Sequence, residues 1–248
     1  MKNICRLCTY QCRNFSLSNF HCKKVQPSNK TKKSSSHEWL SRQLSDPFVE
    51  QAKKFNYRCR SAFKLIEIDD KFKILQPGFS VIDCGAAPGS WTQVAVKRVN
   101  ADFSNKLTPQ GTVVAIDQQL IYPIEGATIF GNQDFTDPKV QEKLLEFLGD
   151  RKANAVISDM APSATGIKSL DDENIVKLSY AAVKFALIVS NVGASVLVKL
   201  WQCKEGNSLK EDIEKFYSKV KFIKPLSSRS DSAEIFILGQ DFKGLKSS

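Results

Sequence analysis

The sequence has no uninterrupted apolar run of about 18 residues, the length that a membrane-spanning helix needs. The nearest approach, residues 185–200, is interrupted by Ser190, Asn191 and Gly193 and contains Lys199. The N-terminus also lacks the short apolar core of a secretory signal. We therefore predict a protein without a membrane span and without a membrane as its partner.

Acidic residues are absent from the first 37 positions, which contain eight Lys and Arg residues and several Ser residues. This leader holds eight of the ten excess positive charges, so the remainder is nearly neutral and its charge is a weak indication of nucleic-acid binding. A segment rich in basic and Ser residues without acids is typical of a mitochondrial presequence. We predict a leader at 1–37, a single folded domain at 38–242 and a short tail at 243–248.

The seven cysteines are an odd number, and four of them lie in the leader, so an evenly spread disulfide framework is absent. Free thiols in a reducing compartment are the expectation. Two other interpretations of the leader stay open: a basic tail that contacts RNA without specificity, and a zinc site, because Cys5 and Cys8 have zinc-ligand spacing. The zinc site would use Cys5, Cys8, Cys12, His21 and Cys22.

Segments with strand and helix patterns alternate through the rest of the chain. Strands are predicted at 79–84, 112–117, 127–130, 154–159, 193–199, 219–224 and 234–239. Helices are predicted to begin after Asp46, Ser61, Asp137 and Ser169, which serve as N-caps, and at 90–99 and 208–218. The alternation predicts an α/β fold with a doubly wound, mostly parallel seven-stranded sheet, whose last two strands place one antiparallel strand at the edge.

The Gly-x-Gly-x-x-Gly pattern of dinucleotide-binding proteins is missing. Instead, the first strand leads into the small residues 85–89, and Asp117, Asp134 and Asp159 end or follow the next three strands. Because ligands of such sheets bind at the carboxyl ends of the strands, this pattern favours an adenosine cofactor without phosphates, S-adenosylmethionine. A tight strand-to-helix turn with solvated acids is the alternative.

Five blocks of sequence resemble the FtsJ/RrmJ-type ribose 2′-O-methyltransferases, in the order in which that family has them. They are residues 60–65, 81–91, 158–162, 198–199 and 233–236, and the similarity extends over residues 38–239. Details at 59–60, 125–127 and 165–166 are most similar to the branch of that family that acts on mitochondrial ribosomal RNA. The resemblance implies a Rossmann-like fold of the S-adenosylmethionine methyltransferase type.

The resemblance also implies the residues of a cofactor site, with no metal. Asp117 is expected at the ribose, Asp134 and Phe135 at the adenine, and Asp159 at the methionine amino group. The other expected contacts, most of them at the methionine end, are Gly85, Pro88, Gly89, Ser90 and Trp91.

The implied catalytic residues are Lys64, Asp159, Lys199 and Glu234. We expect Lys199 to accept the proton of the ribose hydroxyl, because desolvation and a neighbouring ammonium both favour a neutral amine. The two carboxylates would favour a charged Lys199, which would instead orient the hydroxyl. These residues alone do not decide between the two roles.

The resemblance implies 2′-O-methylation of a ribose, expected to be a uridine, in large-subunit rRNA or the assembling large subunit. The site of action would be the mitochondrial matrix, and the protein would be a monomer that supports ribosome assembly. A tRNA or cap methyltransferase and a non-catalytic RNA-binding assembly factor are the alternatives, and a nicotinamide dehydrogenase is disfavoured. Candidate phosphate contacts are Lys53, Lys54, Arg58, Arg60, Lys71, Lys73 and Arg229, and Phe55 and Tyr57 either stack on a base or belong to the core.

Overall fold

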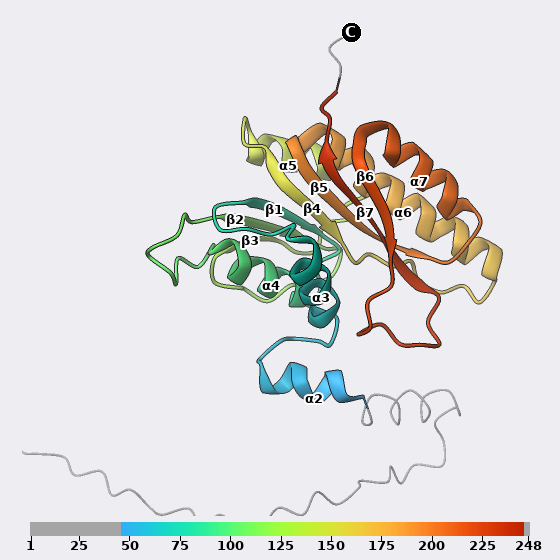
Figure 1. Ribbon diagram of the computed structural model, residues 1–248, viewed down its shortest axis with the longest axis horizontal. Helices are drawn as coiled ribbons and strands as arrows, with labels where there is room; N and C mark the ends of the chain where they lie inside the picture. Colours follow the sequence, from blue (N-terminus) through green and yellow to red (C-terminus); the bar gives the residue numbers. More distant parts are fainter. Residues whose placement is uncertain (1–45, 246–248) are drawn as a thin grey trace, which may run out of the picture. The chain divides into compact units, whose positions relative to one another are not determined.

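The computed structural model describes residues 46–245, in which helices and strands alternate (Figure 1). In chain order the elements are α2 (Pro47–Lys54), α3 (Ala62–Phe72), β1 (Ser80–Cys84), α4 (Ser90–Val99), β2 (Thr112–Ile116), β3 (Ala127–Phe130), α5 (Pro138–Leu148), β4 (Ala153–Ser158), α6 (Lys168–Val189), β5 (Ser190–Trp201), α7 (Glu205–Phe216), β6 (Tyr217–Ile223) and β7 (Glu234–Phe242).

The strands form one seven-stranded sheet in the order β3-β2-β1-β4-β5-β7-β6. Strands β1 to β5 pair in parallel, and β7 is antiparallel to both of its neighbours, β5 and β6. The predicted α/β class with a mostly parallel sheet is confirmed. The antiparallel strand lies one position in from the edge, because the apolar centre of β7, residues 236–239, is buried whereas β6 is largely exposed. Lys219 and Lys221 on β6 protect that edge from pairing with another chain.

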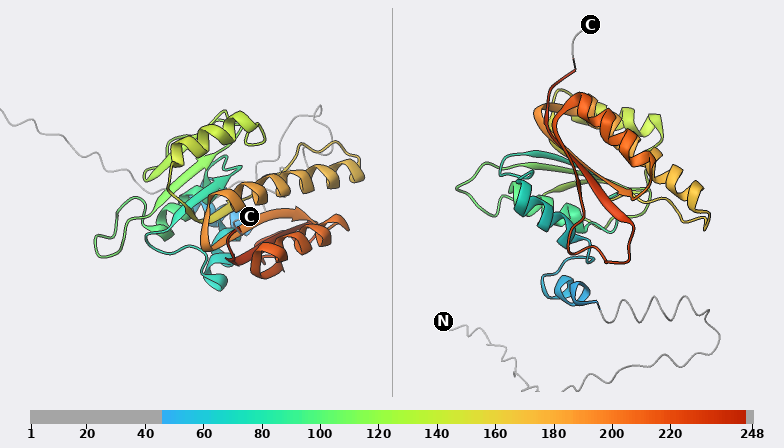
Figure 2. Two further views of the ribbon diagram at one scale, coloured as in Figure 1. Left: turned by 90° about the horizontal axis from the view of Figure 1, so that it is seen from above. Right: turned by 45° about the vertical axis from the view of Figure 1, so that its right-hand side comes forward.

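Helices cover both faces of the sheet (Figures 1 and 2). Helices α3 and α4 pack on one face, in a core that includes Leu65, Trp91 and Phe236. Helices α5, α6 and α7 contribute to the core of the opposite face. Successive residues of a strand point to opposite faces, so Leu197 and Phe236 mark the residues of β5 and β7 that face α3.

The N-termini of the helices show which caps the sequence predicts correctly. Asp46 and Asp137 cap α2 and α5, since each carboxylate accepts the backbone N–H two residues further on, at 3.0 and 2.9 Å. Ser61 stands at the N-cap position of α3, as predicted, but the prediction that Ser169 is a cap is wrong. The Ser61 hydroxyl makes no cap bond and donates to Asp159 instead, and α6 begins at Lys168, so that Ser169 lies within its first turn.

The predicted leader at 1–37 and its alternative zinc ligands lie outside the described residues, as do the start of the predicted domain and the last three residues of the tail. Within residues 46–245, no helix combines the length and apolar character that crossing a membrane requires.

Candidate active site

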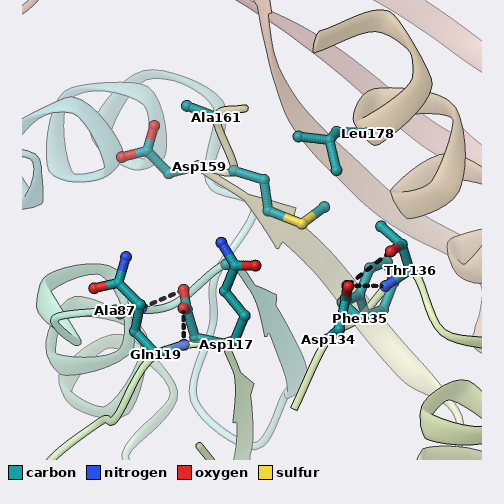
Figure 3. Close-up of a pocket in the computed structure, with 12 residues that line it drawn as sticks. Ala87, Asp117, Gln119, Asp134, Phe135, Thr136, Asp159, Ala161 and Leu178 are labelled. Carbon is teal, nitrogen blue, oxygen red and sulfur yellow. Dashed lines mark hydrogen bonds between the residues drawn. The ribbon is translucent and has the colours of Figure 1, made fainter. Parts of the chain in front are cut away.

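Three carboxylates from three strand ends line one cavity of about 250 Å³ at the carboxyl edge of the parallel strands (Figure 3). Asp117 follows β2, Asp134 follows β3 and Asp159 follows β4. Gly85 and Phe135 also line this cavity, so the structure brings together five of the residues predicted at a cofactor site.

Two of these carboxylates, Asp117 and Asp134, are held by backbone N–H groups, as the dashed lines in Figure 3 show. Asp117 accepts the N–H of Ala87 at 2.9 Å with one oxygen and that of Gln119 at 2.7 Å with the other. Asp134 uses a single oxygen for the N–H and hydroxyl of Thr136. Because each carboxylate oxygen can accept more than one hydrogen bond, both groups can still bind ligand hydroxyl or amino groups.

Gly85 lies where two chain segments approach closely. Its φ is +77°, and a Cβ added there would be 2.2 Å from Cγ of Met160. A side chain at position 85 would therefore strain the backbone and displace the segment that follows β4.

Four of the predicted cofactor residues, Pro88, Gly89, Ser90 and Trp91, do not line this cavity. Ser90 and Trp91 are buried in the first turn of α4, which turns their side chains toward α3. The Trp91 indole N–H donates to the Ser61 carbonyl at 2.9 Å, so this side chain joins α4 to the start of α3.

Further residues line the cavity that the sequence reasoning missed: Ala87, Gln118, Gln119, Thr136, Met160, Ala161 and Leu178. Most of them directly follow one of the predicted acids or the Gly85 turn, and this proximity is the signal that would have found them. Leu178 comes from the middle of α6, and no local pattern singles it out.

The four predicted catalytic residues converge beside this cavity. Lys199 lies two residues after Leu197 on β5, and Glu234 lies two residues before Phe236 on β7. Since alternate residues of a strand point to the same face, both side chains point to the face that α3 covers. Nζ of Lys64 on α3 is 2.7 Å from Oε2 of Glu234.

Lys199 and Asp159 form the second ion pair of this tetrad. Nζ of Lys199 lies 3.0 Å from Oδ1 of Asp159 and also donates to the backbone carbonyl of Asp159. The side chains of the tetrad are between 9% and 17% exposed, so the pairs are partly shielded from water and stay accessible to a substrate.

Positive charge and hydrogen bonds stabilise the ionised form of Asp159. Burial alone would raise its pKa, but the charges of Lys199 and Lys64 and hydrogen bonds from Ser61 and Lys199 outweigh burial and lower the pKa below its usual value. Ser61, missed by the sequence reasoning, thus supports the tetrad.

A further carboxylate, Asp83, is completely buried between β1 and α4. One oxygen accepts the Thr92 hydroxyl at 2.7 Å, and the other has no hydrogen-bond partner. Burial raises the pKa of Asp83 to about 7, and the negative charges of Asp159 and Asp117 act in the same direction.

A second cavity of about 230 Å³ lies on the other side of the tetrad and is lined by Arg60, Lys64, Arg229, Ser232 and Glu234. Two of the predicted RNA contacts, Arg60 and Arg229, are therefore here.

The predicted phosphate contact Arg58 is engaged elsewhere. Its guanidinium donates to the carbonyls of Pro88, Tyr122 and Pro123 at 2.7 to 2.9 Å. Arg58 thereby joins the loop before α4 to the loop after β2, and these backbone carbonyls take part of its hydrogen-bonding capacity.

The comparison with known families agrees with this geometry. Residues 57–242 match the model of the FtsJ-like methyltransferases. The chain belongs to the FtsJ-like methyltransferase family. The resemblance inferred from the five sequence blocks is thereby confirmed.

Several proteins similar to this FtsJ-like methyltransferase have names that refer to ribosomal RNA. The mitochondrial rRNA methyltransferase 2 of Drosophila melanogaster is 54% identical over 222 residues, 89% of each chain. The ribosomal RNA large subunit methyltransferase E of Cereibacter sphaeroides is 45% identical over 215 residues, 87% of each chain. A crystal structure of a ribosomal RNA methyltransferase from Plasmodium falciparum is 28% identical, with a TM-score of 0.66 over 76% of this chain and all of that one.

Proposed function

We propose that this FtsJ-like methyltransferase transfers a methyl group from S-adenosylmethionine to a ribose 2′-hydroxyl of mitochondrial large-subunit rRNA, with a uridine as the target. The observation that carries the proposal is the convergence of Lys64, Asp159, Lys199 and Glu234, from four separate elements, between a cavity lined by carboxylates and a cavity lined by arginines.

The carboxylate-lined cavity fits a cofactor that carries a nucleoside and positive charge. Asp117 has the position and acceptor capacity for ribose hydroxyls, and Asp134 for the adenine amino group. Phe135 and Leu178 supply apolar surface at the same cavity. Three carboxylates around one cavity disfavour the phosphates of a dinucleotide and favour a sulfonium and an ammonium group. S-adenosylmethionine supplies the activated methyl group.

The tetrad then handles the acceptor hydroxyl. Asp159 and Glu234 each fix one lysine, so the two amines hold defined positions beside the cavity. In the proposed mechanism, the ammonium of Lys199 first releases a proton to solvent. The neutral Nζ then accepts the proton of the ribose 2′-oxygen, and Lys64 and Glu234 orient the ribose. Such positioning supplies several kcal/mol, up to about 7–11 in favourable cases.

The substrate and location follow from similar proteins. Their names specify ribosomal RNA, the large subunit in one case and mitochondria in another. A basic leader without acids supports import into the mitochondrial matrix. We propose that the protein acts there as a monomer on large-subunit rRNA or the assembling subunit.

A methyl-transfer assay tests the proposal. The full-length protein is incubated with S-adenosylmethionine carrying a tritiated methyl group and with mitochondrial large-subunit rRNA, assembled large subunits or tRNA, and ribose methylation is mapped. Incorporation at a uridine of the rRNA or the subunit is expected. Transfer to tRNA alone would refute the substrate, and RNA binding without any transfer would indicate a non-catalytic assembly factor.

Variants at Lys199 test the mechanism. Lys199→Met keeps most of the side-chain volume and removes the amine, so we expect a loss of about 100- to 10,000-fold in the rate of transfer, the usual contribution of a general base. Lys199→Arg separates the two roles, because a guanidinium orients a hydroxyl but does not accept its proton. If Lys199 is the proton acceptor, Lys199→Met and Lys199→Arg should be equally impaired in methyl transfer.

The matched control is Lys106→Met in an exposed loop, which should transfer methyl groups at the original rate. Circular dichroism and the dissociation constant of S-adenosylmethionine, expected within about threefold of the original, show that the variants are folded. Full activity of Lys199→Arg would make Lys199 an orienting residue, and full activity of Lys199→Met would remove it from the mechanism.

A further inference from the structure

Both arginines of the cavity beside the tetrad contact a carboxylate of the protein itself. Oδ2 of Asp46, the residue that caps α2, lies 2.8 Å from Nη1 of Arg60 and 3.4 Å from Nη2 of Arg229. Arg60 and Arg229 are 169 positions apart in the sequence, and both contact this carboxylate, of which 8% is exposed. Two guanidinium groups on one oxyanion are the arrangement by which proteins bind phosphate.

The charges of this cavity are not fully balanced by Asp46. Lys64 is paired with Glu234, which leaves two guanidinium groups for a single carboxylate. The longer contact, to Arg229, is also the more exposed one, with 31% of that side chain accessible. In addition, Nε of Arg60 is buried and has no hydrogen-bond partner. An anion with more acceptor oxygens than a carboxylate would satisfy these donors better.

The cavity lies where a substrate strand would enter. It shares Lys64 and Glu234 with the tetrad and no residue with the proposed cofactor cavity. A ribose bound at the tetrad is flanked by phosphates on both sides, and one of them would reach the arginines.

We propose that Asp46 occupies the place of an RNA phosphate in the free protein, and that Arg60 and Arg229 exchange its carboxylate for a phosphate next to the target ribose. This inference rests on the proposed function, because it takes RNA as the substrate. The same carboxylate also caps α2, so the exchange couples RNA binding to a rearrangement at the N-terminus of that helix. Asp46 thereby weakens contact with RNA in general and favours strands that deliver a phosphate to both arginines.

The substitution Asp46→Asn tests this role because Asn caps helices as well as Asp does but carries no charge. The probe is a fluorescein-labelled hairpin of the large-subunit rRNA, and its affinity for the full-length protein is measured by fluorescence anisotropy without cofactor. We expect Asp46→Asn to bind the hairpin about two- to fivefold more tightly, the range that corresponds to breaking one partly exposed ion pair.

Asp137→Asn is the matched control. Asp137 also caps a helix from an Asp-Pro pair and is exposed, so its substitution makes the same change in net charge without touching the cavity. Arg229→Gln should weaken binding and reduce the salt dependence by about one phosphate contact. In the Arg229→Gln background, Asp46→Asn should lose part of its effect, because only the contact of Asp46 with Arg60 then remains to be released.

Unchanged or weaker binding by Asp46→Asn overturns the proposal, and so does tighter binding that persists fully in the Arg229→Gln background. Transfer of tritiated methyl groups by the unmodified protein is measured in parallel. A protein that transfers methyl groups but shows no effect of Asp46→Asn refutes only the exchange. A protein that never transfers them, while Asp46→Asn binds RNA more tightly, refutes only the methyltransferase mechanism.

Discussion

The buried carboxyl group of Asp83 makes the stability of the fold depend on pH in a defined direction. Its pKa is raised from 3.8 to about 7 in the folded protein. Between these two values the folded state holds a proton that the unfolded state has released, so the free energy of unfolding falls as the pH rises. The stability that the protonated group provides is complete below pH 4 and lost once the pH exceeds about 7.

The interval between the two pKa values corresponds to about 4 kcal/mol at most. Between pH 5 and pH 8 the folded protein should lose about 2–3 kcal/mol through this group. Asp83→Asn removes the titration, because its amide oxygen can still accept the Thr92 hydroxyl and the side chain is neutral at every pH. The amide N–H₂ would take the place of an oxygen without a partner, which adds a cost of about 1–3 kcal/mol that does not vary with pH.

Urea unfolding of both proteins at several pH values, followed by circular dichroism, measures the difference. Relative to the original protein, Asp83→Asn should gain about 2–3 kcal/mol between pH 5 and pH 8. Asp137→Asn, an exposed control, should show a constant difference. A constant difference for Asp83→Asn as well, or one that moves in the opposite direction, would refute the raised pKa.

Three other substitutions test the site. Gly85→Ala should lower the free energy of unfolding by about 1–3 kcal/mol in a urea titration, because φ is +77° and the new Cβ would meet Met160. Asp117→Asn should weaken the binding of S-adenosylmethionine about tenfold or more in calorimetry, through loss of a charged acceptor for the ribose, whereas unchanged binding would place the ribose elsewhere. Glu67→Gln should slow methyl transfer and leave cofactor binding intact, because its carboxylate accepts the N–H groups of Leu226 and Ser227 and so fixes the loop that carries Arg229; equal losses of both would contradict this role.

Local patterns in the sequence were sufficient to predict most of the fold. The Asp-Pro pairs at 46–47 and 137–138 mark helix starts because the cap and the fixed φ of proline act within one turn. Ser169 was misassigned because α6 begins at Lys168, one residue before it. The carboxylate of Asp171, in the first turn, accepts the N–H groups of Thr165 and Gly166 in the segment before the helix. The position of β7 between β5 and β6 depends on pairing between distant segments, which periodicity alone does not specify.

The candidate site also has residues that the sequence predicts and residues that it does not. The acids after the strands are visible in the sequence because strand ends gather at one edge of a parallel sheet, and the tetrad followed from the family resemblance. The contacts of Ser61 with Asp159 and of Asp46 with Arg229 link residues 98 and 183 positions apart. Short-range sequence patterns carry no trace of such contacts.

The position of β7 also has a consequence for how the protein is made. Among the seven strands that the structure describes, residues 234–242 are synthesised last, yet they fill the gap between β5 and β6. Until they emerge, both of those strands expose unpaired hydrogen-bonding edges, which are templates for aggregation. Lys64 also lacks its carboxylate partner until then. A prematurely terminated chain that ends before Glu234 is therefore expected to be both inactive and prone to aggregate, so that synthesis of the last strand completes sheet and catalytic tetrad together.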